Sequence, residues 1–351
     1  MQVSFGHNDD VFHNLRKNGS YEWWYFDGVS TDSEYSFVII FFVGIPMSAT
    51  YITSYTNKDF PLDPMENCGI SVNLYHKNKR IFTTLQEGTG KERDFSLTKC
   101  QGVFRANSFS YNEETSSYIL TIDTSNEDSP STLKGNFTFN IPSVIESTHC
   151  DPTDHLWTLV APRATFSASI EVYEYKQKVL QEQINGFAYH DHNCGVEPLH
   201  LHFSQWYWGN IHSEKYSLVF YDVLAFQDRN CEATVTLSTD DSFEQLNVID
   251  VKYSHLRISS MGIRYATQYS FLCISKSGQK IQIDIQKKRI KEQGPFYLRF
   301  AITAEVHFDS EIYKDFVGIA EYMDAQTLHK QWILPFLKVP LLGLPTTHSK
   351  P

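Results

Sequence analysis

The sequence lacks any C-x-x-C pair, and its six cysteines are widely separated along a chain of 351 residues. This spacing excludes a zinc ribbon and a dense disulfide framework. A chain of this length buries enough apolar surface to fold without disulfide bonds or a structural metal. The N-terminus also lacks the basic region and apolar core of a signal peptide. We therefore expect a cytoplasmic protein with reduced and mostly buried thiols.

Long apolar runs and an excess of positive charge are also missing. The longest apolar run, residues 37–47, is too short to span a bilayer and contains Gly44 and Pro46. The net charge is −11, whereas nucleic acids and anionic membrane surfaces select basic patches. We therefore expect neither a membrane span nor a nucleic-acid partner.

The common nucleophile and cofactor motifs are absent as well. There is no G-x-S-x-G nucleophile elbow, no glycine-rich phosphate loop before a helix and no dinucleotide-binding fingerprint. The sequence therefore predicts no cofactor, although binding through residues outside these motifs stays open.

Aromatic residues, in contrast, are abundant: they make up 15% of the chain, with 25 Phe and 20 Tyr. Such side chains favour sheets and apolar pockets. Tyr35–Val43 is almost entirely apolar, which predicts a strand covered on both faces. Residues 165–175 alternate at period two, which predicts a strand with one buried face. The best helical candidate is residues 320–334, which Pro335 ends.

Further strands are expected where apolar residues alternate between turn residues. They are residues 47–55, 69–75, 80–85, 104–111, 118–123, 133–141, 216–226, 232–237, 248–256, 265–274, 280–286 and 296–306. About sixteen strands, in a chain whose length favours roughly two domains, predict an all-β protein made of two barrels or sandwiches.

Residues 185–210 are unusually rich in histidines, acids and large aromatic rings. This stretch contains Asp191, Glu197, His190, His192, His200 and His202. An unpaired carboxylate among aromatic rings is costly, or it stays protonated. Acids in such a setting are therefore candidates for proton chemistry.

Asp191 is the first such candidate. In a strand, Tyr189 and Asp191 share a face, so the tyrosine hydroxyl can donate to the carboxyl group or orient it. A buried Asp held in this way can stay protonated near neutral pH and act as a general acid. The alternative is structural: an Asx turn or strand-end hydrogen bonding, helped by Asn193 and Gly195. Both interpretations stay open.

The two H-x-H pairs of residues 185–210 also suggest a metal site, because H-x-H on a strand places both imidazoles on one side. Glu197 or His212 would supply a third ligand. However, the spacing matches no common zinc pattern. Histidines in strands rich in Tyr and Trp are more often hydrogen-bonded core or pocket residues, so we expect no metal.

His155 and Trp157 share a face if their segment is extended. The pair suits a reaction with a cationic centre, because the indole face attracts positive charge and an imidazole moves protons. The alternative is an ordinary core pair before a strand. Arg163 is expected to anchor a carboxylate such as Glu22 or Glu197, since a buried acid needs a partner.

Five short motifs occur in order through most of the chain. They are YEWWYFDG at 21–28, APRA at 161–164, GFAYHDHNCGVEP at 186–198, WYWG at 206–209 and GIAEY at 318–322. Together they resemble the hydroxyneurosporene synthase (carotenoid 1,2-hydratase) family. Cys194 stands where a larger residue is common in that family. Because Cys194 and Tyr207 are expected to line or back the pocket, the identity of the substrate does not transfer.

The resemblance implies two lipocalin-like β domains packed together, with a ligand pocket at or near their junction. We place these domains at residues 1–203 and 204–351. Family members include cofactor-free hydratases of isoprenoid double bonds, kievitone hydratase and decalin-forming Diels–Alderases, with tocopherol cyclase as a more distant likeness. The expected partner is therefore a hydrophobic small molecule.

The resemblance also implies site residues, since the family's His-x-Trp and Tyr-x-Asp pairs match His155, Trp157, Tyr189 and Asp191. Substrate-binding positions are expected at Glu22, Trp24, Tyr25, Cys194, Trp206 and Trp208. In the predicted reaction Asp191 protonates a C=C bond, Trp157 stabilises the carbocation, and His155 deprotonates water or an internal nucleophile. Two alternatives stay open: a pericyclic cyclase that only folds a polyene, and a non-catalytic carrier of a hydrophobic ligand.

Overall fold

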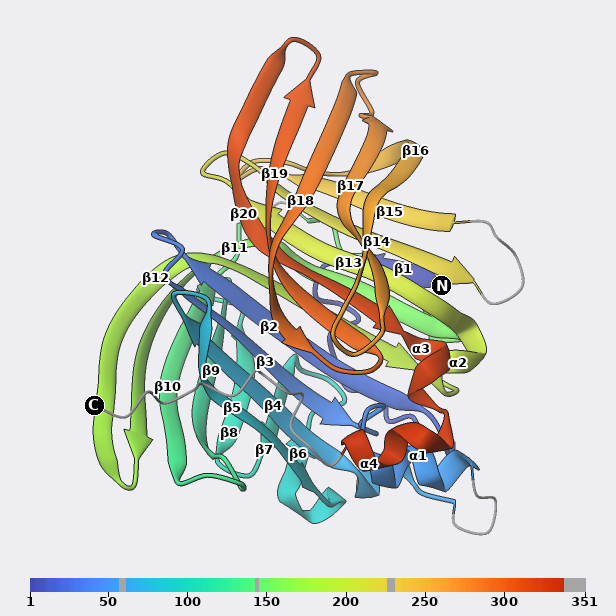
Figure 1. Ribbon diagram of the computed structural model, residues 1–351. Coiled ribbons are helices and arrows are strands. Elements are labelled where there is room, and N and C mark those ends of the chain that lie inside the picture. The colour runs from blue at the N-terminus through green and yellow to red at the C-terminus, as the bar shows by residue number, and fades with distance from the viewer. Residues whose placement is uncertain (57–60, 143–144, 226–230, 338–351) are drawn as a thin grey trace.

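The computed structural model describes residues 1–56, 61–142, 145–225 and 231–337, which form two sheets (Figure 1). The larger sheet is 12-stranded, in the order β5-β4-β3-β2-β12-β11-β10-β9-β8-β7-β6, and β1 pairs with β11 in parallel. The second sheet is a closed barrel that runs from β13 to β20. The predicted all-β class is confirmed, with a curled open sheet beside a barrel.

The strands of the larger sheet are β1 (Gln2–Phe5), β2 (Tyr21–Ser30), β3 (Tyr35–Val43), β4 (Cys68–His76), β5 (Lys79–Gly88), β6 (Arg93–Phe95), β7 (Gln101–Phe104), β8 (Asn107–Asn112), β9 (Ser117–Ser125), β10 (Ser131–Asn140), β11 (His155–Glu174) and β12 (Gln177–Gly195). The barrel strands are β13 (Phe203–His212), β14 (Ser217–Ala225), β15 (Cys231–Ser238), β16 (Phe243–Ile258), β17 (Arg264–Ile274), β18 (Lys280–Gln293), β19 (Tyr297–Phe308) and β20 (Glu311–Asp324).

Strand β3 is buried along its whole length, as its apolar sequence predicts. Its alternate side chains enter two different cores. Ile39 and Phe41 point into the interior of the curled sheet, whereas Ile40 and Phe42 join the layer between that sheet and the barrel. A strand covered on both faces needs apolar residues at every position.

The long strands β11 and β12 run from a half-exposed outer part into this junction. Residues 165–172 alternate between exposed or half-buried and buried side chains, as predicted, and residues 155–164 are all buried. The pairing with β12 shifts register on both sides of Ala161, next to Pro162. Proline has no N–H for the ladder, which accounts for a bulge at this point. The bend lets one strand pair serve the outer sheet and the junction.

Three sequence predictions of secondary structure are wrong in whole or in part. Residues 47–55, expected as a strand, lie mostly in helix α1 (Ala49–Thr56), whose first turn is capped by the Ser48 hydroxyl accepting from the Tyr51 N–H. Residues 320–334, expected as a helix, instead complete strand β20 as far as Asp324. Helix α3 (Ala325–Leu328) follows, with the Asp324 side chain accepting from Thr327 N–H as the N-cap.

Residues 104–111, expected as one strand, are two. Strands β7 and β8 form a tight hairpin in which Phe104 pairs with Asn107. Arg105 has φ 54, a conformation that ends a strand. The buried positions change phase at this turn, from Phe104 to Asn107 and Phe109, a change that the residue types of this stretch do not reveal.

The junction between the two sheets is an apolar layer. It takes side chains from β2, β3, β11 and β12 on one side and from β13, β14, β19 and β20 on the other. Polar groups also cross it: the Asn210 amide donates to Asp27 Oδ2 at 2.7 Å. The larger sheet ends at Gly195 and the barrel begins at Phe203, with α2 (Leu199–His202) between them. The division at 203/204 stays a prediction.

Three thiols, those of Cys68, Cys194 and Cys273, are free and buried. Cys100 and Cys150 are free and only partly covered, and the side chain of Cys231 lies outside the described part. In the described ranges, no helix is both long and apolar enough to cross a membrane.

Candidate active site

The structure brings the predicted Tyr189, Asp191 and Trp157 into direct contact. Tyr189 Oη donates to Asp191 Oδ2 at 2.6 Å, and Trp157 Nε1 donates to the same oxygen at 2.8 Å. The Asn193 amide donates to Asp191 Oδ1 at 2.9 Å. Strand geometry explains these contacts. Tyr189, Asp191 and Asn193 share one face of β12, and Trp157 of the neighbouring strand β11 lies opposite Asn193.

Asp191 is held in an environment that favours its neutral form. The residue is 4% exposed. Burial raises the pKa of Asp191 to about 7, against the hydrogen bonds from Tyr189 and Trp157, which lower it. A carboxyl group with this pKa carries its proton for a substantial fraction of the time at neutral pH.

His155 lies on the same face of β11 as Trp157 and is fully buried. Burial lowers the pKa of His155 to about 3, so the ring is neutral. Its Nδ1 is 2.8 Å from Tyr21 Oη, whereas Nε2 has no partner in the part of the chain that the structure describes. In the tautomer whose Nδ1–H donates to Tyr21, the Nε2 lone pair is free to accept a proton.

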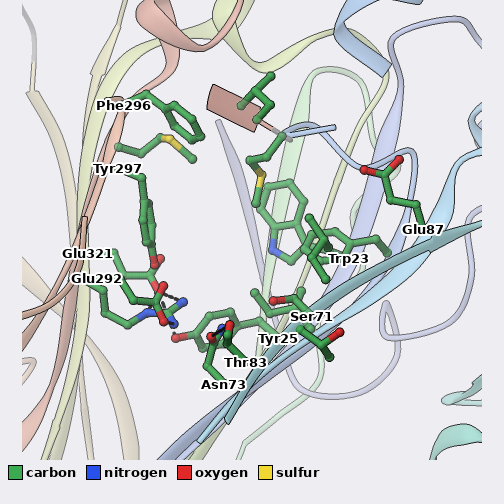
Figure 2. A pocket seen from close by; sticks show the side chains of 18 of the residues that line it. Trp23, Tyr25, Ser71, Asn73, Thr83, Glu87, Glu292, Phe296, Tyr297 and Glu321 are labelled. Atoms are coloured by element: carbon green, nitrogen blue, oxygen red, sulfur yellow. Dashed lines mark hydrogen bonds and ion pairs between the residues drawn. The ribbon is translucent and has the colours of Figure 1, made fainter. Parts of the chain in front are cut away.

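A cavity of about 400 Å³ opens beside these residues, between the curled sheet and the barrel (Figure 2). Its apolar wall comes from β2, β3, the segment before α1, α2 and the barrel, and includes Trp23, Phe42, Met47, Leu199, Trp206, Phe296 and Met323. The predicted pocket near the junction of the two β units is therefore present.

One end of the cavity is polar. Arg299 is 3% exposed and donates to Glu292 Oε1 at 2.9 Å and to Glu321 Oε1 at 2.9 Å and 3.0 Å. Tyr25 Oη donates to the same Glu321 oxygen at 3.1 Å. Burial raises the pKa of Glu292, an effect that the Arg299 charge opposes. Figure 2 shows Glu292, Glu321 and Tyr25 together at this end.

The predicted catalytic residues lie behind the cavity wall rather than in it. Among the described lining residues, none belongs to the set His155, Trp157, Tyr189 and Asp191. Trp23 lines the cavity with its ring centroid 6.0 Å from that of His155. Tyr25 lines it with its ring 6.2 Å from Tyr189. One layer of aromatic rings therefore separates the cavity from Asp191.

Of the predicted substrate-binding residues, Tyr25 and Trp206 line the cavity. Trp208 does not line it but packs on Tyr25 with ring centroids 5.1 Å apart. Glu22, Trp24 and Cys194 are buried and do not line this cavity. Strand alternation is the reason. Glu22 and Trp24 point to the face of β2 opposite that of Trp23 and Tyr25. Cys194 of β12 lies opposite Glu22 and so shares its face.

Sequence reasoning missed Trp23 and the charged group at the polar end. Arg299 interrupts the apolar run of β19, and Glu321 interrupts that of β20. A charge inside an otherwise apolar and buried strand is a signal that was available, because buried charges are rare unless paired. Their pairing, however, depends on strand register that the sequence does not show.

Arg163 and the second histidine pair differ from expectation. Arg163 binds Asp240 through Nε at 2.7 Å, and neither Glu22 nor Glu197 is its partner among its described contacts. His200 and His202 lie in α2 rather than in a strand, where the His200 ring stacks on His329 at 3.8 Å. Pro198 stands at the N-cap of this short helix.

The two residues considered as third metal ligands are engaged elsewhere. Glu197 pairs with Lys17, and His212 Nδ1 is 2.7 Å from Ser217 Oγ. The pair His190 and His192 does share one side of β12, as predicted. Their partners are acids: His190 Nε2 lies 3.2 Å from Asp10 Oδ2, and His192 Nε2 lies 3.0 Å from Glu22 Oε1.

The fold and the site define a class: an all-β protein with a buried carboxyl group of raised pKa behind the aromatic wall of a cavity. The chain belongs to the carotenoid hydratase CrtC family, whose model matches residues 39–345. It is 28% identical over 349 residues to the hydroxyneurosporene dehydrogenase of Chlorobaculum tepidum, an alignment that covers 93% of this chain and 88% of the relative.

A second curated relative is the acyclic carotenoid 1,2-hydratase of Thiocapsa roseopersicina, 24% identical over 210 residues. That alignment covers 59% of this chain and 48% of the relative. Among solved structures, CghA with Sch210972 has a TM-score of 0.63 at 12% identity, covering 88% of this chain and 89% of that one. Kievitone hydratase from Nectria haematococca has a TM-score of 0.54 at 13% identity, covering 92% and 96%. These structural likenesses concern the fold.

Proposed function

We propose that the protein is a hydratase or cyclase that protonates a C=C bond of a lipophilic isoprenoid or polyketide substrate. The observation that carries the proposal is the Asp191 carboxyl group. Burial raises its pKa to about 7, and its oxygens accept from Tyr189 and Trp157 next to an apolar cavity. Family membership and the name of the Thiocapsa hydratase support the isoprenoid class.

The cavity suits a hydrophobic ligand that is compact, or the end of a long chain. Its volume, about 400 Å³, is near the lower end of the ~300–1,000 Å³ range of small-molecule pockets. Aromatic and aliphatic side chains form part of the wall, and polar side chains line it both at the Arg299 group and along β4, β5 and residues 126–128. A largely apolar ligand that carries oxygen groups matches this lining.

The reaction follows from the protonation states of the residues. Neutral Asp191 transfers its proton to one alkene carbon, which leaves a carbocation on the other carbon and a carboxylate on Asp191. The electron-rich face of Trp157 stabilises the cation. His155 Nε2 takes a proton from the attacking water, or from an internal hydroxyl in a cyclisation, and a proton then returns to Asp191. Contact between alkene and Asp191 requires displacement of Trp23 or Tyr25.

Replacing Asp191 by Asn tests the proposal. We expect D191N to lose at least about 10²-fold in turnover of an acyclic carotenoid, because general acid catalysis contributes 10²–10⁴-fold, while ligand binding measured by fluorescence quenching is retained. D222N is the matched control. Asp222 is also fully buried and burial raises its pKa to about 6, but it lies in β14 and has no partner among the described side chains. Full activity of D191N would refute the role of Asp191.

A pericyclic cyclase is the second candidate, and the separation of Asp191 from the cavity by Trp23 and Tyr25 favours it. In that case the cavity folds a polyene and no acid is needed. Turnover in deuterated water separates the two: alkene protonation places deuterium on carbon in the product, and a cycloaddition does not. A carrier would bind ligand with no product in the wild type or in either variant.

A further inference from the structure

Three carboxyl groups are buried together on the face of the larger sheet that points away from the cavity. Asp9 and Asp10 come from the segment before β2, and Glu22 comes from β2. They are 1%, 0% and 1% exposed. Buried charges are paired or bind metal ions, because an isolated buried charge is very costly.

The cations that face these acids are histidines. Asp9 pairs with His149, Asp10 with His190 and His192, and Glu22 with His13 and His192. Within the described ranges, no ion pair joins Asp9, Asp10 or Glu22 to a lysine or arginine. No permanently charged side chain therefore faces these three acids, so positive charge there has to come from a proton on an imidazole or from a bound cation.

Glu22 is the centre of the group. Its Oε1 lies 2.9 Å from His13 Nδ1 and 3.0 Å from His192 Nε2. One nitrogen from each ring and one carboxylate oxygen all lie within 4.8 Å of one another. Glu22 Oε2 is buried and has no partner in the part of the chain that the structure describes, so one oxygen of a buried carboxylate is left without a donor.

The orientation of His192 is the one that a metal ligand would need. His192 Nδ1 is 2.9 Å from the carbonyl oxygen of Asp9, and only an N–H can bond there. In the neutral ring Nε2 then carries a lone pair directed at Glu22 Oε1, which is also electron-rich. This arrangement is typical of metal ligands, whose second nitrogen donates to a carbonyl or carboxylate and so aims the first at the ion.

We propose that His13 Nδ1, His192 Nε2 and the Glu22 carboxylate bind a divalent transition-metal ion, Zn²⁺ by preference, with the remaining position open to water. Two imidazoles and one carboxylate are a common ligand set for zinc and for related ions. Ligands about 2.0–2.1 Å from a tetrahedral ion lie roughly 3.3 Å apart. The observed N–O separations of 2.9 Å and 3.0 Å need only a small outward shift.

The ion would join the N-terminal segment to the sheet. His13 lies on that segment, Glu22 on β2 and His192 on β12, so one ion crosslinks three separate pieces of chain. β12 carries Tyr189 and Asp191 on its other face. The His13 side chain is 12% exposed, which gives the ion a route from solvent. The proposed site is independent of the reaction assigned to Asp191.

Metal titration of untagged protein, stripped with a chelator and dialysed, tests the site. We expect one Zn²⁺ per chain by calorimetry and elemental analysis, and a rise in Tm on adding Zn²⁺. Co²⁺ in its place should show the strong visible absorption of a four-coordinate ion. The site is refuted if folded wild-type protein binds neither Zn²⁺ nor Co²⁺. It is also refuted if Zn²⁺ leaves Tm unchanged, which is the result expected if the histidines pair with the acids only as protonated rings.

The variants H13Q and H149Q locate the ion. H13Q removes one ligand from a partly exposed position and should weaken Zn²⁺ binding at least ~100-fold, since even outer-shell changes cost 10–100-fold. H149Q is the matched control, because His149 also contacts a buried acid, Asp9, but its side chain is 66% exposed and it lies outside the ligand set. H13Q that binds zinc as tightly as the wild type would overturn the proposal.

Discussion

Asp191 and Asp222 are both buried carboxyl groups, and they differ in their neighbours. Asp191 accepts from Tyr189, Trp157 and Asn193, whereas Asp222 has no partner among the described side chains. Burial raises the pKa of both, to about 7 and about 6. Only Asp191 lies behind the cavity wall and in contact with Trp157, so the surroundings rather than the residue type select the acid.

The pH dependence of activity follows from these pKa values. Asp191 must be protonated to act, so kcat/KM should be level below about pH 7 and fall about tenfold per pH unit above it. His155, with a pKa of about 3, stays neutral throughout this range. Steady-state kinetics between pH 5 and 9 measure the profile. A rise in kcat/KM from pH 6 to 9 would contradict the assignment of Asp191 as the acid.

The stability contribution of Asp191 has the opposite sign from that of a salt-bridged acid. Its folded pKa lies above the usual value of 3.8, so the folded state binds more protons than the unfolded state between about pH 4 and 7. The free energy of unfolding should fall as pH rises through this window. Urea unfolding of D191N should show a weaker fall, because Asn does not titrate.

Lys287 is buried inside the barrel without a hydrogen-bond partner among the described residues. Its Nζ lies 3.8 Å from the ring centroid of Phe300 and 4.3 Å from that of Tyr269. Burial holds the pKa of Lys287 well below its usual value. We expect K287M to raise the free energy of unfolding by about 1–3 kcal/mol at pH 7, as measured by urea denaturation.

The gain from K287M should shrink as pH rises toward 10. At neutral pH the lysine is protonated in the unfolded state but is held largely neutral by burial in the folded state. The free energy of unfolding of the wild type therefore rises with pH until the unfolded lysine also loses its proton. K276M is the control, because Lys276 is exposed and its replacement should change stability by less than about 0.5 kcal/mol. A K287M variant less stable than the wild type would show that ring contacts outweigh desolvation.

At the scale of the element, strand β20 closes the barrel through a glycine. A Cβ on Gly318 would lie 1.9 Å from the carbonyl oxygen of Asn210 in β13, and backbone cannot move away cheaply. We therefore expect G318A to destabilise the protein by about 2–3 kcal/mol. Thermal unfolding measures the loss.

G262A is the comparison for that variant. Gly262 has φ +85 and nothing within 4 Å of the added Cβ, so only the left-handed backbone is penalised, by about 1–2 kcal/mol. If G318A lowered the free energy of unfolding by no more than G262A does, the inferred close contact between the backbones of β20 and β13 would be contradicted.

Patterning predicted the elements that lie in a uniform environment. The apolar run of β3 and the alternation of residues 165–172 report burial on two faces and on one face, and both predictions are confirmed. Patterning failed for residues 47–55 and for the first part of residues 320–334, which belongs to β20. There the outcome depends on a Ser48 hydroxyl and an Asp324 cap, which are local contacts with no period.

At the scale of the whole molecule, Arg163 connects β11 to the barrel. It is 6% exposed and donates to the carbonyls of Ser213 and Glu214 at 3.2 Å and 2.7 Å. Its carboxylate partner Asp240 is 72% exposed. We expect R163M to lower the free energy of unfolding by about 1–3 kcal/mol, because the buried carbonyl of Ser213 and the partly buried one of Glu214 lose a charged donor.

D240N should cost less than about 1 kcal/mol, because an exposed partner contributes little. Urea denaturation of both variants compares the two contributions. Equal losses would show that the ion pair, rather than the carbonyl contacts, connects β11 to the barrel.

The sequence by itself determined the all-β class, the apolar strands and the candidates Tyr189, Asp191 and Trp157. These follow from side-chain periodicity, which is local, and from motifs that resemble a known family. Only the tertiary structure decided that Trp23 rather than Trp24 faces the cavity, that Arg299 meets Glu292 and Glu321, and that His13 meets Glu22 and His192. Those contacts join residues from separate strands and segments, and strand register and sheet curvature, which no single segment encodes, bring them together.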